Sequence, residues 1–306
     1  MTTLQERLDA GDVLIIDGAM GTELERRGAE MDGAAWAGTA MKSQPEMNGA
    51  IHRDFIEAGA DIIIANTYAS APHVLRHAGV DESEARELNR LGCAIAHEAV
   101  RVSAADREVY VAGSLSSFRA GLHLDTLPSE AEGRASYRAQ AEALAEGGCD
   151  LLIAEMMLDP VISPWAIEAA VATGLPVWIG LSARVTDGRV MGFHQYADDP
   201  FETVLDACLA FGGQAAGIMH SDIDVMAPAL AALKARWDGP LFAYPHSGHF
   251  EMPHWRFDCV ITPEDYVTKA RGYLGMGAQA VGGCCGLGPE HIRLLKQKLP
   301  TRGTAK

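Results

Sequence analysis

Basic side chains are scarce in this sequence, where 25 Lys and Arg stand against 41 Asp and Glu and give a formal charge of −16. The resulting field repels phosphate backbones and anionic lipid surfaces, so nucleic-acid binding is disfavoured. Long apolar runs are also missing, because no stretch approaches the roughly 20 apolar residues that cross a bilayer. Residues 1–12 are polar and lack the apolar centre of a signal peptide. We therefore expect a cytoplasmic protein with no membrane contact.

Cysteine is scarce as well. Without a secretory signal, the scattered spacing argues against a disulfide framework, and the adjacent pair Cys284 and Cys285 suggests metal or redox chemistry in a reducing compartment. No repeat or linker-like run divides the chain, and its length fits one barrel, so we expect a single domain over residues 1–306. The six cysteines lie at positions 93, 149, 208, 259, 284 and 285.

What the chain does contain is a series of short apolar, β-branched runs that alternate with amphipathic, Ala- and Glu-rich segments. Eight such runs, spaced regularly along the chain, are typical of buried parallel strands. An open doubly wound sheet fits the alternation, but eight regular units favour a closed (β/α)8 barrel of the TIM type. Connections over 18–45, 114–135 and 246–262 exceed normal loop lengths, which is typical of functional loops. The expected strands cover 13–17, 61–66, 109–113, 151–155, 177–181, 215–219, 241–245 and 278–283.

In a barrel of this type the active site lies at the carboxyl ends of the strands, so the polar residues at those ends are the candidates. The strongest signal is GGCCG at 282–286, because flanking glycines permit the bend that brings two adjacent thiols to one side. The alternatives without metal are that the two cysteines are small buried residues or form a vicinal disulfide. The remaining strand-end candidates are Asp17, Gly18, Asn66, Thr67, Tyr68, Ser114, Glu155, Ser182, His220 and Tyr244.

A catalytic zinc site has three protein ligands and an open fourth position, so Cys284 and Cys285 need one more partner. His220, at the end of the sixth expected strand, is the natural third ligand. The alternatives are the three histidines of the unusual stretch after strand seven, which could equally be exposed loop residues. These are His246, His249 and His254.

Three segments resemble the homocysteine S-methyltransferase family, which consists of zinc-dependent (β/α)8 barrels. They are DGAMGTELERRG at 17–28, HRDFIEAGADIIIANTY at 52–68 and GGCCG at 282–286. LLIAEMM at 151–157 resembles the strand whose acidic residue holds the substrate ammonium group, which implies that role for Glu155. The resemblance further implies a homocysteine site that includes Asp17, Gly18, Thr67 and Ser114, with Trp36 near the methyl donor. We add Tyr244, at the end of strand seven, to the expected substrate-binding residues.

The chain departs from the family at the third metal ligand. The family pattern Gly-x-Asn-Cys is replaced by Gly217-Ile218-Met219-His220, so a histidine stands where the cysteine is expected. A Cys2His site remains reasonable for zinc, because neutral imidazole binds this metal well. The change makes the site more positive by one charge, which strengthens the Lewis acid and weakens a bound thiolate as a nucleophile.

The resemblance implies an enzyme that moves a methyl group from a small sulfonium or quaternary ammonium donor to a thiol, most plainly homocysteine, with zinc as its only cofactor. No GxGxxG helix start indicates a nucleotide cofactor. A different acceptor, zinc hydrolysis with Glu155 as base, and a non-catalytic zinc or thiol sensor are the alternatives. The sequence locates no self-association surface, so it predicts no oligomeric state.

Overall fold

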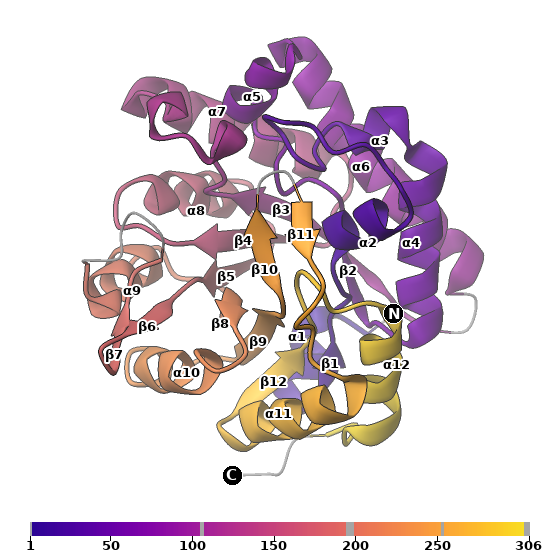
Figure 1. The fold of residues 1–306 in the computed structure, drawn as a ribbon, viewed down its shortest axis with the longest axis vertical. Coiled ribbons are helices and arrows are strands. Elements are labelled where there is room, and N and C mark those ends of the chain that lie inside the picture. Colours follow the sequence, from indigo (N-terminus) through magenta and orange to yellow (C-terminus); the bar gives the residue numbers. More distant parts are fainter. Residues whose placement is uncertain (1, 105–106, 194–198, 252–253, 303–306) are drawn as a thin grey trace.

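The protein folds as a (β/α)8 barrel, seen here in a computed structural model that describes residues 2–104, 107–193, 199–251 and 254–302. Eight parallel strands follow one another in the order β1-β12-β9-β8-β5-β4-β3-β2, and a parallel bridge between Ile16 and Ile62 links the two ends of this sheet. Helices surround the strands (Figure 1). The barrel strands are β1 (Leu14–Ile15), β2 (Ile62–Ile64), β3 (Tyr110–Ser116), β4 (Leu151–Met157), β5 (Val177–Leu181), β8 (Ala215–Asp222), β9 (Leu241–His246) and β12 (Ala278–Val281).

The helices begin and end at residues with local reasons to do so. Ser129 starts α7, where its hydroxyl accepts from the Glu132 backbone and the Glu132 carboxylate accepts from the Ser129 backbone. Pro45 is the first residue of α4, and Gly59 ends that helix at a φ of 109°. The helices are α1 (Leu4–Asp9), α2 (Met20–Arg26), α3 (Ala40–Ser43), α4 (Pro45–Ala58), α5 (Pro72–Leu75), α6 (Glu82–Ser103), α7 (Glu130–Glu146), α8 (Ile162–Ala172), α9 (Phe201–Leu209), α10 (Met226–Lys234), α11 (Pro263–Gly275) and α12 (Pro289–Lys298).

The long connections hold structure of their own. The first contains α2 and α3, and the second contains the short 3-10 helices η2 (Ala120–Leu122) and η3 (Leu124–Thr126), while η1 (Arg76–Ala78) follows α5. The third forms an antiparallel hairpin of β10 (His249–Glu251) and β11 (His254–Arg256), and a second hairpin pairs β6 (Arg184–Thr186) with β7 (Arg189–Met191). In Figure 1 the β10–β11 hairpin stands over the centre of the barrel.

The predicted barrel and its eight strands are confirmed, with differences at the strand ends. Ser114 and His220 were expected just after their strands, but β3 and β8 continue past them to Ser116 and Asp222. Polar residues extend these strands because neighbouring strand ends supply hydrogen-bond partners, such as the Thr67 hydroxyl that bonds the Ser114 backbone. Within the described residues, none of the helices combines the length and apolar character of a membrane span.

Candidate active site

Three side chains from separate parts of the chain meet at the carboxyl end of the barrel. Glu155 on β4, His220 on β8 and Cys284 after β12 are buried, and their potential ligand atoms all lie within 4.8 Å of one another. Cys284 Sγ is 3.1 Å from His220 Nδ1, and His220 Nε2 is 2.8 Å from Glu155 Oε1. These distances place a thiol, an imidazole and a carboxylate where a single metal ion could contact them.

The paired cysteines lie on a tight turn rather than on the strand itself. β12 ends at Val281, and the Cys284 backbone N–H donates to the Pro245 carbonyl at 2.7 Å. Gly286 permits the turn, because its φ is 85° and an added Cβ would lie 2.0 Å from the Ser247 carbonyl oxygen. The bend brings the two sulfurs to one side, with Cys284 Sγ and Cys285 Sγ 3.7 Å apart.

This sulfur spacing fits a tetrahedral metal. Two thiolates about 2.3 Å from one zinc ion lie about 3.8 Å apart, and a thiolate and an imidazole nitrogen about 3.6 Å apart. The observed 3.7 Å for the sulfur pair matches, and 3.1 Å from Cys284 Sγ to His220 Nδ1 is a few tenths shorter. The cluster consists of Glu155, His220 and Cys284, whereas the predicted ligands were Cys284, Cys285 and His220. Cys285 lies next to this cluster through its contact with Cys284.

His220 is held in an unusual backbone conformation. Its φ is 47°, a left-handed value that costs a non-glycine residue on the order of 1 to 3 kcal/mol and is typical of functional sites. The Tyr68 ring stacks on the imidazole, with centroids 5.1 Å apart and an angle of 23° between the planes. Two other residues at the site share the left-handed conformation, namely Trp36 at 47° and Met156 at 56°.

Both oxygens of the Glu155 carboxylate have partners from the protein. Oε1 lies against His220 Nε2, and Oε2 accepts a short hydrogen bond from the Ser114 hydroxyl. Ser114 is fixed in turn by Thr67, whose hydroxyl donates to the Ser114 carbonyl at 3.0 Å and accepts from its N–H at 2.9 Å. Ser114 and Thr67 are fully buried. They therefore act on the site through Glu155 instead of facing the pocket.

Asp17 is a second buried carboxylate near the cluster. It accepts from the Ile64 backbone N–H at 2.8 Å and from the Tyr244 hydroxyl at 3.3 Å, and Tyr244 also bonds the Gly18 carbonyl at 3.1 Å. Burial raises the pKa of Asp17 well above its usual range, and the Glu155 charge adds to the increase. Asp17 is fully buried and borders the site through its contact with Tyr244.

The electrostatics favour protons or a cation between these groups. Burial and the neighbouring Cys285 sulfur raise the pKa of the Cys284 thiol well above its usual range. Burial alone would lower the pKa of His220, but Cys284 and Glu155 beside the ring raise it to about 10. A divalent cation would displace these protons, because thiolate and neutral imidazole are the forms that bind metal.

A small pocket opens above the cluster. Predicted site residues that line it are Gly18, Trp36, Glu155, His220, Tyr244, Cys284 and Cys285, whereas Asp17, Thr67 and Ser114 lie behind its walls. No Lys or Arg is among the described residues of this lining. Within this mostly apolar lining, Glu155 supplies the acidic group, and Cys284 and Cys285 supply thiols.

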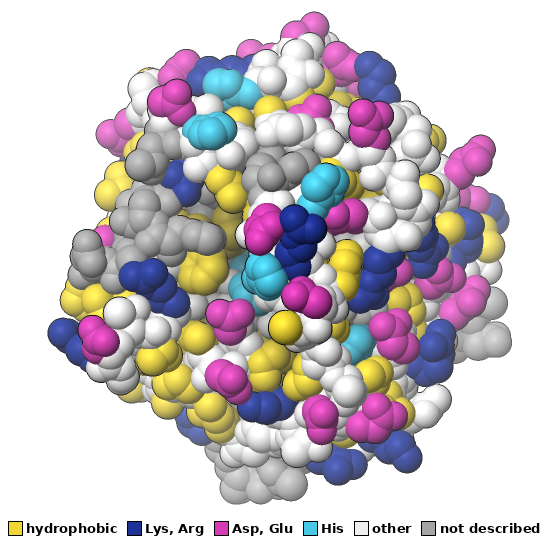
Figure 2. Space-filling model, in the orientation of Figure 1, with side chains coloured by type: hydrophobic (Ala, Val, Ile, Leu, Met, Phe, Trp, Pro, Cys, Tyr) yellow, Lys and Arg dark blue, Asp and Glu magenta, His cyan; other side chains and the backbone are white. Residues whose placement is uncertain are grey.

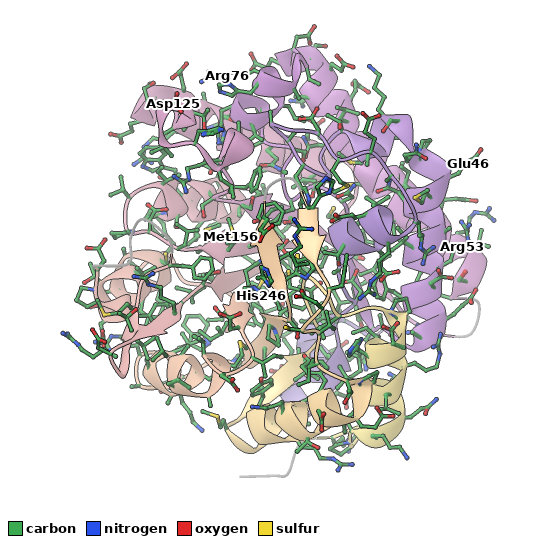
Figure 3. The ribbon with its side chains drawn as sticks, viewed as in Figure 1. Glu46, Arg53, Arg76, Asp125, Met156 and His246 are labelled. Atoms are coloured by element: carbon green, nitrogen blue, oxygen red, sulfur yellow. The ribbon has the colours of Figure 1, made fainter. Side chains whose placement is uncertain are left out.

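A second, larger pocket shares Trp36, Tyr68, His220 and Cys285 with the first and extends under the hairpin. Aromatic rings dominate this second pocket. The ring centroids of Trp36 and Phe250 are 5.8 Å apart, and those of Tyr68 and Phe118 are 5.5 Å apart. Figure 3 shows Met156 and His246 at the centre of the barrel, whereas Glu46 and Arg53 lie on the outer helix α4. Sequence reasoning missed Phe118, Phe250 and Trp255, and their only signal was an aromatic residue within a long connection.

The alternative histidine ligands have other partners. His246 Nε2 is 2.8 Å from Asp222 Oδ1, and His254 Nδ1 is 2.9 Å from Glu25 Oε1. His249 and His254 are exposed on the hairpin, where Figure 2 shows histidine and acidic side chains gathered at the surface. Among the described residues, only His220 joins a cysteine in a cluster that could hold a metal.

Comparison with known proteins identifies the chain's relatives. The family model for homocysteine S-methyltransferases matches residues 14–299. The chain belongs to the homocysteine S-methyltransferase family. Its family, its enzyme class as a methyltransferase and its barrel fold are thus as predicted. Membership also supports homocysteine as the methyl acceptor.

Relatives in this family align along nearly the whole chain. Homocysteine S-methyltransferase YbgG of Bacillus subtilis is 28% identical and covers 96% of both sequences. Betaine–homocysteine S-methyltransferase 1 of mouse is 29% identical over 97% of this chain and 75% of its own. The metallated form of the homocysteine methyltransferase MmuM from Escherichia coli superimposes with a TM-score of 0.75 at 26% identity, covering 95% of this chain and 98% of that one.

Proposed function

We propose that this protein transfers a methyl group from a small sulfonium or quaternary ammonium donor to the thiol of homocysteine, giving methionine, as a single-domain cytoplasmic enzyme with a zinc site. One observation carries the proposal: Cys284, Cys285 and His220 converge at the floor of a pocket with acidic and aromatic walls. That combination suits a thiol acceptor and a cationic donor at adjoining positions. The relative that was solved in a metallated form supports the metal.

Cys284, Cys285 and His220 would hold the zinc ion and leave a fourth position open to the pocket. When bound, zinc supplies Lewis acidity that lowers the pKa of a coordinated thiol and fixes its sulfur in place. The flanking backbone keeps the two cysteine sulfurs together, with Ser247 N–H donating to the Cys285 carbonyl at 2.9 Å. A turn that already holds the two sulfurs together would lower the entropic cost of forming the metal site.

The acidic wall of the first pocket would receive the ammonium group of the amino-acid substrate. Glu155 lines that pocket, and its oxygens keep unused lone pairs beside their bonds to His220 and Ser114. Asp17 lies behind Tyr244, and burial raises its pKa, so Glu155 is the acidic group that faces the pocket. A cationic group in this pocket would be attracted to Glu155, and this attraction is stronger at the low dielectric of the pocket than it would be in water.

The aromatic pocket would hold the methyl donor. A positively charged onium group is attracted to ring faces, and Trp36, Tyr68 and Phe250 offer rings at one side of the pocket. Trp36 Nε1 is buried without a hydrogen-bond partner among the described residues. This N–H would donate to an oxygen of the bound substrate or donor. Trp36 lines both pockets, so it stands where donor and acceptor meet.

The test begins with zinc per chain, measured by elemental mass spectrometry on protein purified under reducing conditions. Methionine formation from homocysteine follows, with S-methylmethionine and a betaine as alternative donors. We expect about one zinc per chain in the wild type, and loss of both zinc and turnover in Cys285→Ala. Cys259→Ala changes an exposed cysteine and is the matched control. Full activity without zinc would contradict the mechanism.

The alternatives from the sequence have less support. Family membership favours methyl transfer over hydrolysis, and a sensor without activity requires zinc binding with no methyl transfer to any acceptor. A screen of thiols beside homocysteine distinguishes a changed acceptor from a lost activity. If the enzyme methylates another thiol and not homocysteine, the proposed acceptor is wrong and the proposed metal site stands.

A further inference from the structure

A continuous line of contacts runs from the interior of the barrel to the cysteine pair. The Ser114 hydroxyl donates to Glu155 Oε2, the other Glu155 oxygen lies 2.8 Å from His220 Nε2, and His220 Nδ1 lies 3.1 Å from Cys284 Sγ. Ser114, Glu155 and His220 lie on β3, β4 and β8. Strand β4 pairs with β3, and β5 lies between β4 and β8. The Cys284 sulfur is nearer to Nδ1 than to Nε2, which lies 3.8 Å from it, and Nε2 has Glu155 as its nearer partner.

We propose that Glu155, anchored by Ser114, is a positioning residue that directs Nδ1 of His220 toward the metal and thereby lets a histidine serve where the family pattern has a cysteine. The proposal rests on the proposed function for the existence of the metal site. It assigns to Glu155 a task besides binding the substrate ammonium group.

Geometry gives the reason that such a residue is needed. A cysteine has one sulfur and one possible ligand atom, whereas an imidazole has two nitrogens and coordinates correctly only when the other nitrogen carries the proton. A carboxylate that accepts the Nε2 proton selects that form, fixes the plane of the ring and makes Nδ1 a better ligand. The Glu155 carboxylate occupies the required position on the Nε2 side.

The surroundings leave His220 little freedom to turn over. Its backbone has a φ of 47°, and the Tyr68 ring covers one face of the imidazole at 5.1 Å. Ser114 cannot move away from Glu155 easily, because Thr67 bonds both its backbone N–H and its carbonyl. The carboxylate is therefore held from behind before any metal or substrate arrives.

The same barrel contains a second histidine–carboxylate pair that provides a control. His246 Nε2 lies 2.8 Å from Asp222 Oδ1, the same separation as in the Glu155 pair. The Asp222 side chain is 63% exposed, whereas that of Glu155 is 7% exposed. His246 is outside the cluster of potential ligands among the described residues. Loss of a carboxylate from this pair should leave the metal site unchanged.

The first experiment measures Zn²⁺ affinity by competition with a chromophoric chelator, using metal-free full-length protein and no substrate. We expect Glu155→Gln to weaken zinc binding roughly 10- to 100-fold, as loss of a carboxylate partner does at other histidine–metal sites. Ser114→Ala should weaken it less, and Asp222→Asn should leave it unchanged. The absorption spectrum of the Co²⁺ protein should change in Glu155→Gln and stay as in the wild type in Asp222→Asn.

A second background isolates the histidine. In His220→Cys, which has no imidazole to orient, adding Glu155→Gln should leave zinc affinity unchanged within about twofold, because the coupling disappears. A long-range ¹H–¹⁵N correlation spectrum of the zinc-loaded wild type should place the remaining ring proton on Nε2 of His220. This spectrum requires no variant, so it decides the matter even where Glu155→Gln fails to fold.

The outcomes separate this proposal from the proposed function. Wild-type zinc affinity and an unchanged Co²⁺ spectrum in Glu155→Gln, with a raised KM for homocysteine, would overturn the positioning role and leave the ammonium role standing. A ring proton on Nδ1 of His220 would overturn it as well. The positioning role would be supported if Glu155→Gln weakens zinc binding when His220 is present but not when it is replaced in His220→Cys. That result would hold even if the wild type transferred no methyl group.

Discussion

The two ends of the barrel treat buried carboxylates in opposite ways. At the amino end, Asp61 precedes β2 and contacts Lys296 Nζ at 3.0 Å and Arg7 Nη1 at 3.4 Å, while the Ile15 backbone N–H donates to it at 2.9 Å. At the carboxyl end, Glu155 has a hydroxyl and an imidazole as partners, and no Lys or Arg lines the pockets among the described residues.

The difference separates a structural charge from a functional one. A buried charge is costly unless it is paired. At the amino end Lys296 and Arg7 pair with Asp61, so its charge is compensated within the protein. At the carboxyl end the nearest partner is the His220 imidazole, and under the proposed function a metal, an ammonium group or an onium donor would bring further positive charge from outside. This division agrees with the general pattern of such barrels, in which stability is concentrated at one face and chemistry at the other.

The largest effect is expected from breaking the carboxyl end at its centre. Cys284→Ala removes the sulfur between His220 and Cys285, and it should lower methyl transfer at least about 1000-fold, or about 4 kcal/mol of transition-state stabilisation. Zinc content should fall with it, while the melting temperature of the metal-free protein stays within a few degrees. Cys208→Ala, at a buried cysteine on α9, should keep zinc and turnover. Equal losses in both variants would refute the assignment.

Breaking the amino end should instead reduce stability. Asp61→Asn leaves Lys296, Arg7 and the nearby Arg107 without their shared carboxylate, and we expect a loss of about 3 kcal/mol, reduced from the fully buried case because the cations are partly exposed. The melting temperature should fall by about 5 to 10 °C. KM for homocysteine should not change. Asp224→Asn, at an exposed pair with Lys269, serves as the control and should shift stability by less than about 0.5 kcal/mol.

His52 in α4 represents a third case, a buried ionisable group with no hydrogen-bond partner for either ring nitrogen among the described residues. Burial lowers its pKa to about 3, whereas an unfolded histidine titrates near 6.5. As pH falls below 6.5, the unfolded chain takes up a proton that the folded protein does not, so stability is lost between pH 6.5 and 3. The contribution is about 2 to 3 kcal/mol at pH 4.5.

Denaturant unfolding of His52→Leu at pH 7.5 and 4.5 measures this contribution. The variant should lose less stability on acidification than the wild type, with part of the dependence left to His73, whose pKa burial lowers to about 4. His77→Gln changes an exposed histidine on η1 and should retain the wild-type pH dependence. An unchanged slope in His52→Leu would mean that this side chain reaches solvent or a partner.

The smallest expected effect sharpens the description of the donor side. Trp36→Phe keeps a ring but removes the unpartnered N–H, so KM for a substrate with a carboxylate should rise about 3- to 10-fold, near 1 kcal/mol. Stability should be equal or slightly higher, because the buried donor no longer lacks a partner. A KM unchanged for both donor and homocysteine would remove Trp36 Nε1 from the binding site.

The sequence indicated much of the fold because strands in a closed barrel are buried on both faces and read as apolar runs. The fifth strand was expected over 177–181 and is Val177–Leu181. The paired cysteines were also predictable, since glycines on both sides signal a turn. Ends of strands were less predictable, because polar residues such as Ser116 and Asp222 pair across the barrel rim and extend strands that seemed to stop earlier.

Other parts of the site depended on positions far apart in the chain. The sequence favoured His220 as the partner of the cysteines, because it stands where the family pattern has a cysteine, but it left His246, His249 and His254 as alternatives. Barrel closure sets the contacts, because β8 places His220 beside the turn after β12, whereas the hairpin brings His254 to Glu25. The aromatic pocket likewise combines rings from the first loop, the end of β2 and the hairpin.

By itself, the sequence determined the family, the eight-unit barrel and the residue types of the site, because apolar periodicity and the GGCCG turn are local properties. Only the tertiary structure decided which groups touch, and it placed Glu155 between Ser114 and His220 across separations of 41 and 65 residues. Hydrogen bonds depend on distances of a few tenths of an ångström and on ring orientation. Those quantities are set by the closure and packing of all eight strands together.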